Sequence, residues 1–414
     1  SCQSDEARKT IDRKRKALVV LSLIIDLGLL GYFKYTNFFA GMICQMIGHN
    51  FQPWDIFLPV GISFFTFQSM SYTIDVYRRS LKPLPHLLDY AFYVSFFPQL
   101  VAGPIVRASD FAPQISKPIV ITNDMFARGV YFIIIGLFKK AVISDYISLN
   151  FVDRIFDNPM LYSGLENLVG IYGYALQIYC DFSGYSDMAI GIALLLGFHF
   201  PQNFNAPYRS ISITDFWRRW HISLSTWIRD YIYISLGGNR KGKVRQYINL
   251  IITMLLGGLW HGASLNLVAR GGMHGLDLAV HKFFSQHIMH HDRNYVSRGI
   301  KKVLAVVLTF HFVCFTWIFF RQNTFAAGWT MIRQIFMNFH PELLLQFVNG
   351  YKYVLAFMVF GFVTHFLPDR WQEAIIGALK RSNVVVYAVL ITAVIYIVIQ
   401  VKSSTIQPFI YFQF

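Results

Sequence analysis

The stretch that decides the fold class is 303-VLAVVLTFHFVCFTWIFF-320, eighteen residues without Asp, Glu, Lys or Arg. A helix of about 20 apolar residues is long enough to cross the hydrocarbon core of a bilayer. Lipid offers backbone groups no hydrogen-bond partner, so such segments must be helical. Less regular apolar sequence occupies 87–106 and 248–280. The clear candidate spans are 17–39, 56–77, 126–149, 164–180, 182–200, 300–320, 351–367 and 384–401. The sequence therefore predicts an all-α polytopic integral membrane protein.

The composition supports this class. Hydrophobic residues make up 55% of the 414 residues and charged residues only 14%, whereas soluble domains carry about 25% charged residues. The net charge of +15 comes from short basic runs between apolar segments, which is typical of cytoplasmic loops. We therefore expect the lipid bilayer, and no nucleic acid, as a partner. The first basic run, at 8–16, places the start of the first span on the cytoplasmic side.

The chain is expected to form a single membrane-embedded domain over 1–414, because no polar linker divides it. Two stretches do not follow the pattern of simple spans. Pro98 and Pro104 interrupt apolar sequence at 95–111 and predict a broken, re-entrant element. The stretch 214–231 places aromatic residues at helical spacing beside arginines, which predicts one amphipathic helix at the membrane interface.

The sharpest candidate for chemistry is His261, within 253-TMLLGGLWHGASLN-266. It lies 16 residues after Arg245, about 24 Å along a helix, which places it deep in the membrane. An ionisable residue there is a functional candidate, and imidazole suits general-base chemistry. The alternative is a neutral histidine bonded to a neighbouring helix. His221 and His274 are weaker candidates, for which a packing role is open.

Charged residues near apolar sequence are the other candidates. Asp181 and Asp187 must pair or face a polar cavity, and we expect them to pair with one or more of Arg218, Arg219 and Arg229. The basic loop around Lys241, Lys243 and Arg245 could attract the phosphates of an anionic cofactor. Because Cys2, Cys44, Cys180 and Cys314 lie far apart, no metal site is expected.

Several of these motifs together carry a family resemblance. The runs 181-DFSGYSDMAIG-191, 200-FPQNFNAPYRS-210, 212-SITDFWRRWHISLSTWIRDYIYISLGGNR-240 and 257-GGLWHGA-263 are its densest part. They are supported by 96-FFPQLVAGPIVR-107, 315-FTWIFFR-321 and 408-PFIYFQF-414. On these residues the chain resembles the membrane-bound O-acyltransferase family, in the bacterial branch that contains alginate O-acetyltransferase.

The resemblance implies a fold and an activity. The fold is a multi-helix bundle with a central tunnel, located in the bacterial inner membrane. The activity is transfer of an acetyl group from a cytoplasmic thioester donor, acetyl-CoA, toward hydroxyls of an exported polysaccharide such as alginate. A separate extracytoplasmic acetyltransferase or acceptor-binding protein is the expected partner.

The resemblance also assigns residues. It maps the family's tunnel histidine onto His261 and a second, commonly retained histidine onto His221. The remaining candidates are expected to bind substrate: Trp260, Asn266, Arg218, Arg219, Lys241, Lys243, Arg245 and Asp181. Two departures stand out. Relatives usually begin with about two more membrane helices, and they commonly carry an aromatic residue where this chain has Arg270, a cation that is costly in apolar sequence unless paired.

Two other functions remain as alternatives. A sister branch transfers D-alanyl groups from a carrier protein to teichoic acid, although "GGNR" and "SGYSD" favour the acetylating branch. A transporter or flippase could use the same broken helices and buried charges. The absence of an internal sequence repeat argues against such a transporter.

Overall fold

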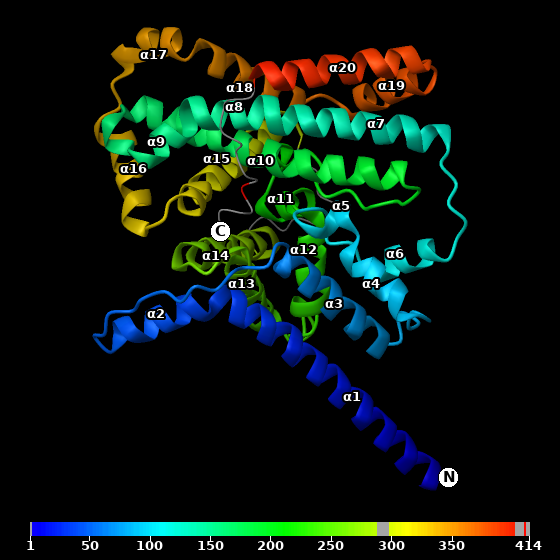
Figure 1. Cartoon of the computed structure of the whole chain (residues 1–414). Coiled ribbons are helices and arrows are strands. Elements are labelled where there is room, and N and C mark those ends of the chain that lie inside the picture. Colours follow the sequence, from blue (N-terminus) through cyan, green and yellow to red (C-terminus); the bar gives the residue numbers. More distant parts are fainter. Residues whose placement is uncertain (1, 288–297, 402–409, 411–414) are drawn as a thin grey trace. The chain divides into compact units, whose positions relative to one another are not determined.

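The computed structural model describes residues 2–287, 298–401 and 410. Within these residues every regular element is helical and none is a strand, which confirms the all-α prediction (Figure 1). Most of the 408–414 motif lies outside the described residues. Two described helical stretches are long and apolar enough to cross a membrane, Arg8–Met46 and Gly299–Arg321. The pair Pro341–Gly350 and Lys352–His365 is apolar enough only when taken together, and it is bent by 91°.

The contacts divide the chain into two compact units, residues 1–120 with 196–201, and residues 121–195 with 202–414. The single-domain organisation stays a prediction. The helices of the first unit are α1 (Cys2–Leu30), α2 (Thr36–Met46), α3 (Ile62–Tyr77), α4 (Leu87–Ser95), α5 (Phe97–Leu100) and α6 (Ala108–Ile115), with the π-helix η1 (Gly31–Tyr35). The span predicted at 56–77 is helical only from Ile62.

The first unit contains the broken element predicted at 95–111. The chain leaves α4 at Phe96, whose ψ of 109° is extended, and Pro98 occupies the first turn of α5, where a missing N–H costs no hydrogen bond. Aromatic rings fill the space beside this break. Phe111 stacks on Phe198 at 5.1 Å, and Phe96 contacts both rings. The break is therefore held by packing.

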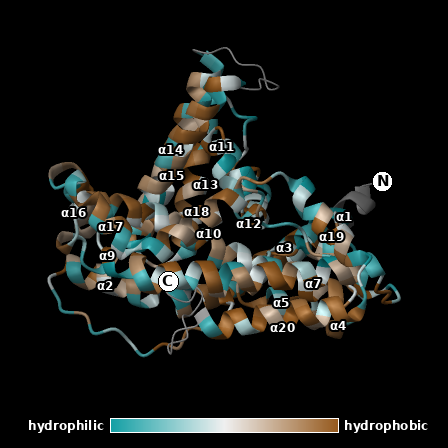
Figure 2. Cartoon of the chain, turned by 90° about the horizontal axis from the view of Figure 1, so that it is seen from above, coloured by the Kyte–Doolittle hydropathy of each residue, from teal (hydrophilic) through white to brown (hydrophobic). Residues whose placement is uncertain are grey.

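The longer helices of the second unit are α7 (Asn123–Leu137), α10 (Gly164–Leu195), α13 (Lys243–His261), α14 (Leu265–His287), α15 (Gly299–Arg321), α16 (Phe325–Met337), α18 (Lys352–His365), α19 (Asp369–Lys380) and α20 (Val384–Val401). Its shorter elements are η2 (Phe138–Ser144), α8 (Asp145–Ile147), η3 (Ser148–Val152), α9 (Asp153–Asp157), η4 (Pro159–Leu161), η5 (Pro207–Arg209), α11 (Ile213–Arg219), α12 (Ile222–Ile228), η6 (Arg229–Tyr233), η7 (Pro341–Leu343) and α17 (Leu344–Gly350). Figure 2 colours much of α15 and α20 as hydrophobic.

One prediction in this unit was wrong. The spans expected at 164–180 and 182–200 are a single helix, α10, that continues through Asp181. The carboxylate does not interrupt the helix because Lys140 lies 2.6 Å from it and neutralises its charge. Lys139 does the same for Asp187 at 2.7 Å. Both lysines lie in η2, a π-helical turn that follows α7.

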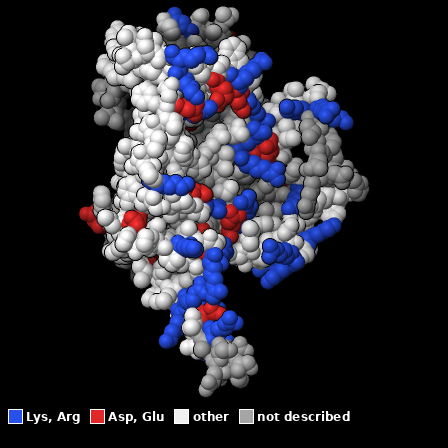
Figure 3. Space-filling view, turned by 90° about the vertical axis from the view of Figure 1, so that its right-hand side faces the viewer, with Lys and Arg blue, Asp and Glu red and all other residues white. Residues whose placement is uncertain are grey.

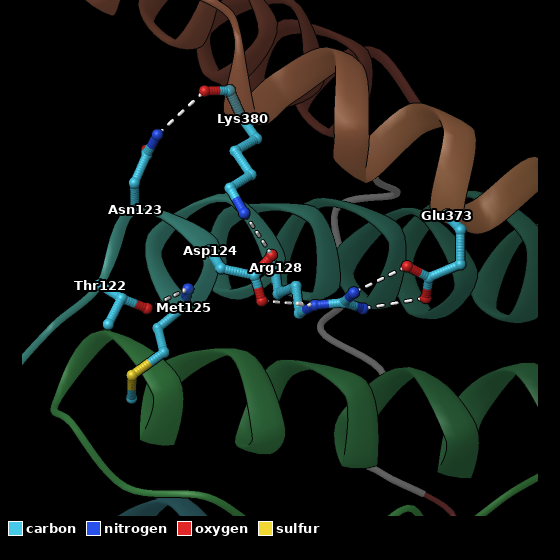
Figure 4. Close-up of polar contacts among 7 residues, drawn as sticks. All are labelled: Thr122, Asn123, Asp124, Met125, Arg128, Glu373 and Lys380. Atoms are coloured by element: carbon cyan, nitrogen blue, oxygen red, sulfur yellow. Dashed lines mark hydrogen bonds and ion pairs between the residues drawn. The ribbon is translucent and has the colours of Figure 1, made fainter.

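Helix α19 is fastened to the start of α7 by ion pairs (Figure 4). Arg128 binds both carboxylate oxygens of Glu373, at 2.9 and 2.7 Å, and Asp124 at 2.9 Å. Lys380 contacts Asp124 at 3.2 Å. These partners hold the pKa of Glu373 and of Asp124 below its ordinary value, chiefly through hydrogen bonds from Arg128. The pairing therefore ties together helices about 250 residues apart in sequence.

Helices α13 and α14 form a hairpin whose backbones touch. A Cβ on Gly258 would lie 2.3 Å from the carbonyl oxygen of Leu267, and one on Gly271 would lie 2.3 Å from that of Met254. Only glycine permits such an approach. This close approach brings the end of α13 against the start of α14.

The amphipathic helix predicted over 214–231 is also wrong as a single element. It is divided into α11 and α12 at Trp220 and His221, where His221 adopts a left-handed φ of 44°. Asn203 stabilises this kink, since its backbone oxygen accepts the N–H of Ile222 at 2.9 Å and its side-chain oxygen accepts the hydroxyl of Ser223 at 2.8 Å. The kink buries His221 completely.

Candidate active site

A pocket of about 370 Å³ lies in the second unit among α11, α12, η6, α13 and α14. Six of the residues that line it are basic or histidine: Arg218, Arg229, Arg270, Lys282, His261 and His274. Among the described lining residues there is no aspartate or glutamate. The two arginines of α11 and η6 are exposed, whereas both histidines are buried. The pocket therefore leads from exposed cations to buried imidazoles, an arrangement suited to an elongated anionic ligand.

His261 is the last residue of α13, and it is 6% exposed. Its Nδ1 lies 2.6 Å from the carbonyl oxygen of Gly257. A carbonyl can only accept, so Nδ1 carries the proton and the neutral ring has its lone pair on Nε2. Trp260 and Phe320 pack edge-on against the ring at 5.2 and 5.8 Å. The ring is thus held in one tautomer, with Nε2 as the basic nitrogen.

His221 is coupled to His261 through an aromatic neighbour. Trp260 lies with its ring centre 6.0 Å from His221 and 5.2 Å from His261. The Nδ1–H of His221 donates to Asn203 Oδ1 at 3.2 Å, and Phe182 packs edge-on against its ring at 4.6 Å. The two predicted catalytic histidines therefore come from different parts of the chain, and both contact the ring of Trp260.

Arg270 is 2% exposed, and its guanidinium stays protonated in proteins. Its guanidinium lies over the rings of Trp317 at 4.3 Å and Phe320 at 4.5 Å. Cation–π contacts of this kind are worth about 2 kcal/mol or more when desolvated. Two aromatic faces therefore stabilise the cation within apolar sequence, and they hold it at the pocket wall.

The predicted partners of the acidic residues were wrong. Asp181 and Asp187 pair with lysines of η2 and not with an arginine of 214–231. Asp181 also accepts the backbone N–H of Ile410 at 3.0 Å. The arginines use local carboxylates: Arg219 pairs with Asp215 at 2.9 Å and Arg229 with Asp230 at 2.6 Å. Sequence reasoning missed both lysines because they lie 41 and 48 residues from their partners.

The other predicted site residues separate into two groups. Arg218 lines the pocket with His261. The residues that line it do not include Asp181, Trp260, Asn266 or Arg219. The side-chain amide of Asn266 donates to the carbonyl of Gln322 at 2.9 Å. Of the basic residues predicted to form a loop, Lys241 precedes α13, whereas Lys243 and Arg245 lie in its first turn. All three are exposed, and Lys243 contacts His287 at 3.3 Å. On the face in Figure 3, Lys and Arg gather in clusters, and wide areas carry no charge.

Fold and site together define an integral membrane protein with a pocket that is lined by histidines and basic side chains. Residues 21–321 match the model of the membrane-bound O-acyltransferase family. The chain belongs to this family, whose members are polytopic membrane proteins.

Curated relatives come from two branches. The chain is 43% identical to the probable alginate O-acetylase of Pseudomonas aeruginosa over 330 residues, which cover 78% of this chain and 61% of the relative. It is 39% identical to the peptidoglycan O-acetyltransferase of Helicobacter pylori, over 77% of this chain and 64% of that protein. The teichoic acid D-alanyltransferase of Bacillus subtilis is 31% identical over 69% of this chain and 75% of that protein. The chain thus spans less than two thirds of the first two relatives.

Proposed function

We propose that this chain is an O-acyltransferase of the bacterial inner membrane that moves an acetyl group from acetyl-CoA toward hydroxyls of an exported polysaccharide. The observation that carries the proposal is His261, a buried histidine whose tautomer is fixed by Gly257 and which lines a cationic pocket. The names of the two relatives compared at 43% and 39% identity, an alginate O-acetylase and a peptidoglycan O-acetyltransferase, support the acetyl group and the polysaccharide class.

In this proposal His261 supplies proton transfer. Its Nε2 takes the proton of the acceptor hydroxyl while the oxygen attacks the thioester carbonyl carbon. The carbon–sulfur bond then breaks, and the thiolate leaves with the proton that His261 returns. General-base assistance of this kind contributes about 10²–10⁴-fold to the rate. The acceptor is a sugar hydroxyl or a group on an extracytoplasmic partner protein that completes the transfer.

The pocket orients the donor. The nucleotide phosphates of acetyl-CoA lie at the exposed end, near Arg218, Arg229 and Lys282, and the thioester reaches the buried end. Transfer of D-alanyl groups from a carrier protein is the second candidate, because a teichoic acid D-alanyltransferase is 31% identical to the chain. The two donors share a phosphopantetheine thioester, so the same pocket serves either chemistry.

The test of the proposal replaces His261. In purified protein supplied with radiolabelled acetyl-CoA, His261→Ala and His261→Gln are expected to abolish acetyl transfer or hydrolysis, since neither alanine nor glutamine takes up a proton near neutral pH. His221→Ala is expected to retain part of the activity, because His221 acts through Trp260.

The matched control is His311→Gln. His311 also donates from Nδ1 to the carbonyl four residues earlier, Val307, at 2.8 Å, but it is exposed on α15 and does not line the pocket. This variant is expected to keep wild-type turnover. Retention of more than about a tenth of wild-type turnover by either His261 variant contradicts the assignment of the base.

A further inference from the structure

His274 is a second histidine in the wall of the pocket. It lies on α14 and is completely buried. Three aromatic rings fix its plane: Phe216 stacks on it at 6.3 Å, and Trp217 and Phe312 pack edge-on at 5.3 and 5.6 Å. Its orientation is therefore determined as closely as that of His261.

The hydrogen bonds of Thr316 determine the tautomer of His274. The hydroxyl of Thr316 donates to the carbonyl of Val313 at 2.8 Å, which uses its single proton. The same oxygen lies 3.0 Å from His274 Nε2, so it must accept a hydrogen bond there. Nε2 therefore carries the proton, and Nδ1 is left as an acceptor.

Within the described residues this Nδ1 is buried and has no hydrogen-bond partner. A buried acceptor that goes unsatisfied costs about 1–3 kcal/mol, so a ligand with an N–H or O–H donor is favoured at this wall. A phosphate or a carboxylate is not favoured there, because it has only acceptor oxygens and cannot donate a hydrogen bond to Nδ1.

We propose that His274 is a positioning residue, which accepts a hydrogen bond at Nδ1 from an amide N–H of the pantetheine arm of the thioester donor. The inference rests on the proposed function and adds a second point of donor recognition. The cations at the exposed end attract phosphates, while His274 binds the uncharged arm between the phosphates and the thioester. The bond adds affinity for the arm in the ground state and the transition state alike, so its loss acts on KM.

Two substitutions separate the two ring nitrogens. His274→Asn places its amide oxygen near the position of Nδ1 and loses the bond to Thr316. His274→Gln keeps a donor near the position of Nε2 and loses the acceptor. Each variant is measured with acetyl-CoA, with S-acetylpantetheine, which has the arm without the nucleotide, and with p-nitrophenyl acetate, which has neither.

His274→Gln is expected to raise KM about three- to tenfold for both thioesters, the loss of one hydrogen bond, with kcat nearly unchanged. His274→Asn is expected to restore most of the affinity. The loss with p-nitrophenyl acetate is expected to be smaller than with either thioester in both variants, because this ester has no amide N–H to donate to Nδ1.

Three results overturn the inference. One is an unchanged KM for S-acetylpantetheine in His274→Gln. Another is an equal loss with p-nitrophenyl acetate, which shows a purely structural role. A third is a wild-type protein that takes no acetyl group from either thioester, which overturns the proposed function as well. The first two outcomes leave the proposed function standing.

Discussion

The close contact between α13 and α14 allows us to predict how an added methyl group changes stability and activity, from the distances between the two backbones. Gly271→Ala places a Cβ 2.3 Å from the carbonyl oxygen of Met254, whereas ordinary contacts begin at 3.4 Å. The obstacle is backbone, which cannot rotate away. The two helices must therefore separate by about 1 Å, a form of overpacking that costs about 1–3 kcal/mol.

The displacement also reaches His261, which lies two turns after Met254 on the same helix. A shift of about 1 Å in catalytic geometry can lower turnover about 100-fold. The variant is therefore expected to unfold at a lower temperature in detergent and to lose acetyl transfer. Unfolding is followed by circular dichroism or by the fluorescence of a thiol-reactive dye, and transfer by radiolabelled acetyl-CoA.

The control is the adjacent glycine. A Cβ on Gly272 meets only the Cδ2 atom of Leu255, at 3.3 Å, and the end of a leucine side chain can move. Gly272→Ala also gains helix propensity of up to about 1 kcal/mol, so it is expected to be neutral or slightly stabilised and fully active. If Gly271→Ala and Gly272→Ala have the same melting temperature and turnover, the reasoning from backbone contact is refuted.

Two further predictions concern charge. Neutralising Lys241, Lys243 and Arg245 together is expected to raise the KM for acetyl-CoA and flatten its salt dependence without changing kcat, since charge attraction is screened over about 8 Å at physiological ionic strength. Neutralising Arg218 and Lys282, which line the pocket, is expected to raise the KM for acetyl-CoA further. If either set of substitutions leaves this KM within twofold of wild type, those residues do not form the entrance for the donor. The pKa of Glu373 lies below its ordinary value of 4.5. The pair with Arg128 therefore contributes stability above pH 4.5. This stability is lost as the pH falls through the lowered pKa of the folded state. Both side chains are partly exposed, which limits the contribution to about 1 kcal/mol. Melting temperatures of wild type and Glu373→Gln are expected to differ at pH 6 and to converge in acid, and a constant difference over this range contradicts the pairing.

The sequence was sufficient where a single local property decides the outcome. Uninterrupted apolar sequence at 303–320 predicts α15, and it is helical from Gly299 to Arg321. Pro98 predicts the break in 95–111, because a missing N–H acts on its own turn. The histidine at 261 could be singled out because a polar residue after a long uncharged run is conspicuous in sequence.

The sequence was insufficient where distant residues decide the outcome. The kink at His221 is stabilised by Asn203, eighteen residues earlier, whose backbone and side-chain oxygens accept the N–H groups of Ile222 and Ser223. Helical periodicity alone favours continuity through 214–231, and only this tertiary contact overrides it. In the same way α10 continues through Asp181 because Lys140 pairs with it. The local sequence of α10 or of η2 does not predict this pairing. His274 acquires its tautomer from Thr316, 42 residues away.

The position of His261 at the end of α13 bears on the proposed chemistry. Gly262 is extended, with φ of −174°, so the helix ends there and its last carbonyls have no partner within the helix. Such an end carries about half a negative charge, which stabilises a nearby cation by about 0.3–1 kcal/mol, and more when partly buried. In the proposed reaction His261 becomes a cation at this location. The carbonyl of Gly257 already accepts its Nδ1–H at 2.6 Å, and that bond strengthens when the ring is charged. His261 thus depends on two features of the hairpin. The glycines bring α13 against α14, and the end of α13 stabilises the imidazolium. A change in the geometry of the hairpin therefore also changes the chemistry of the base.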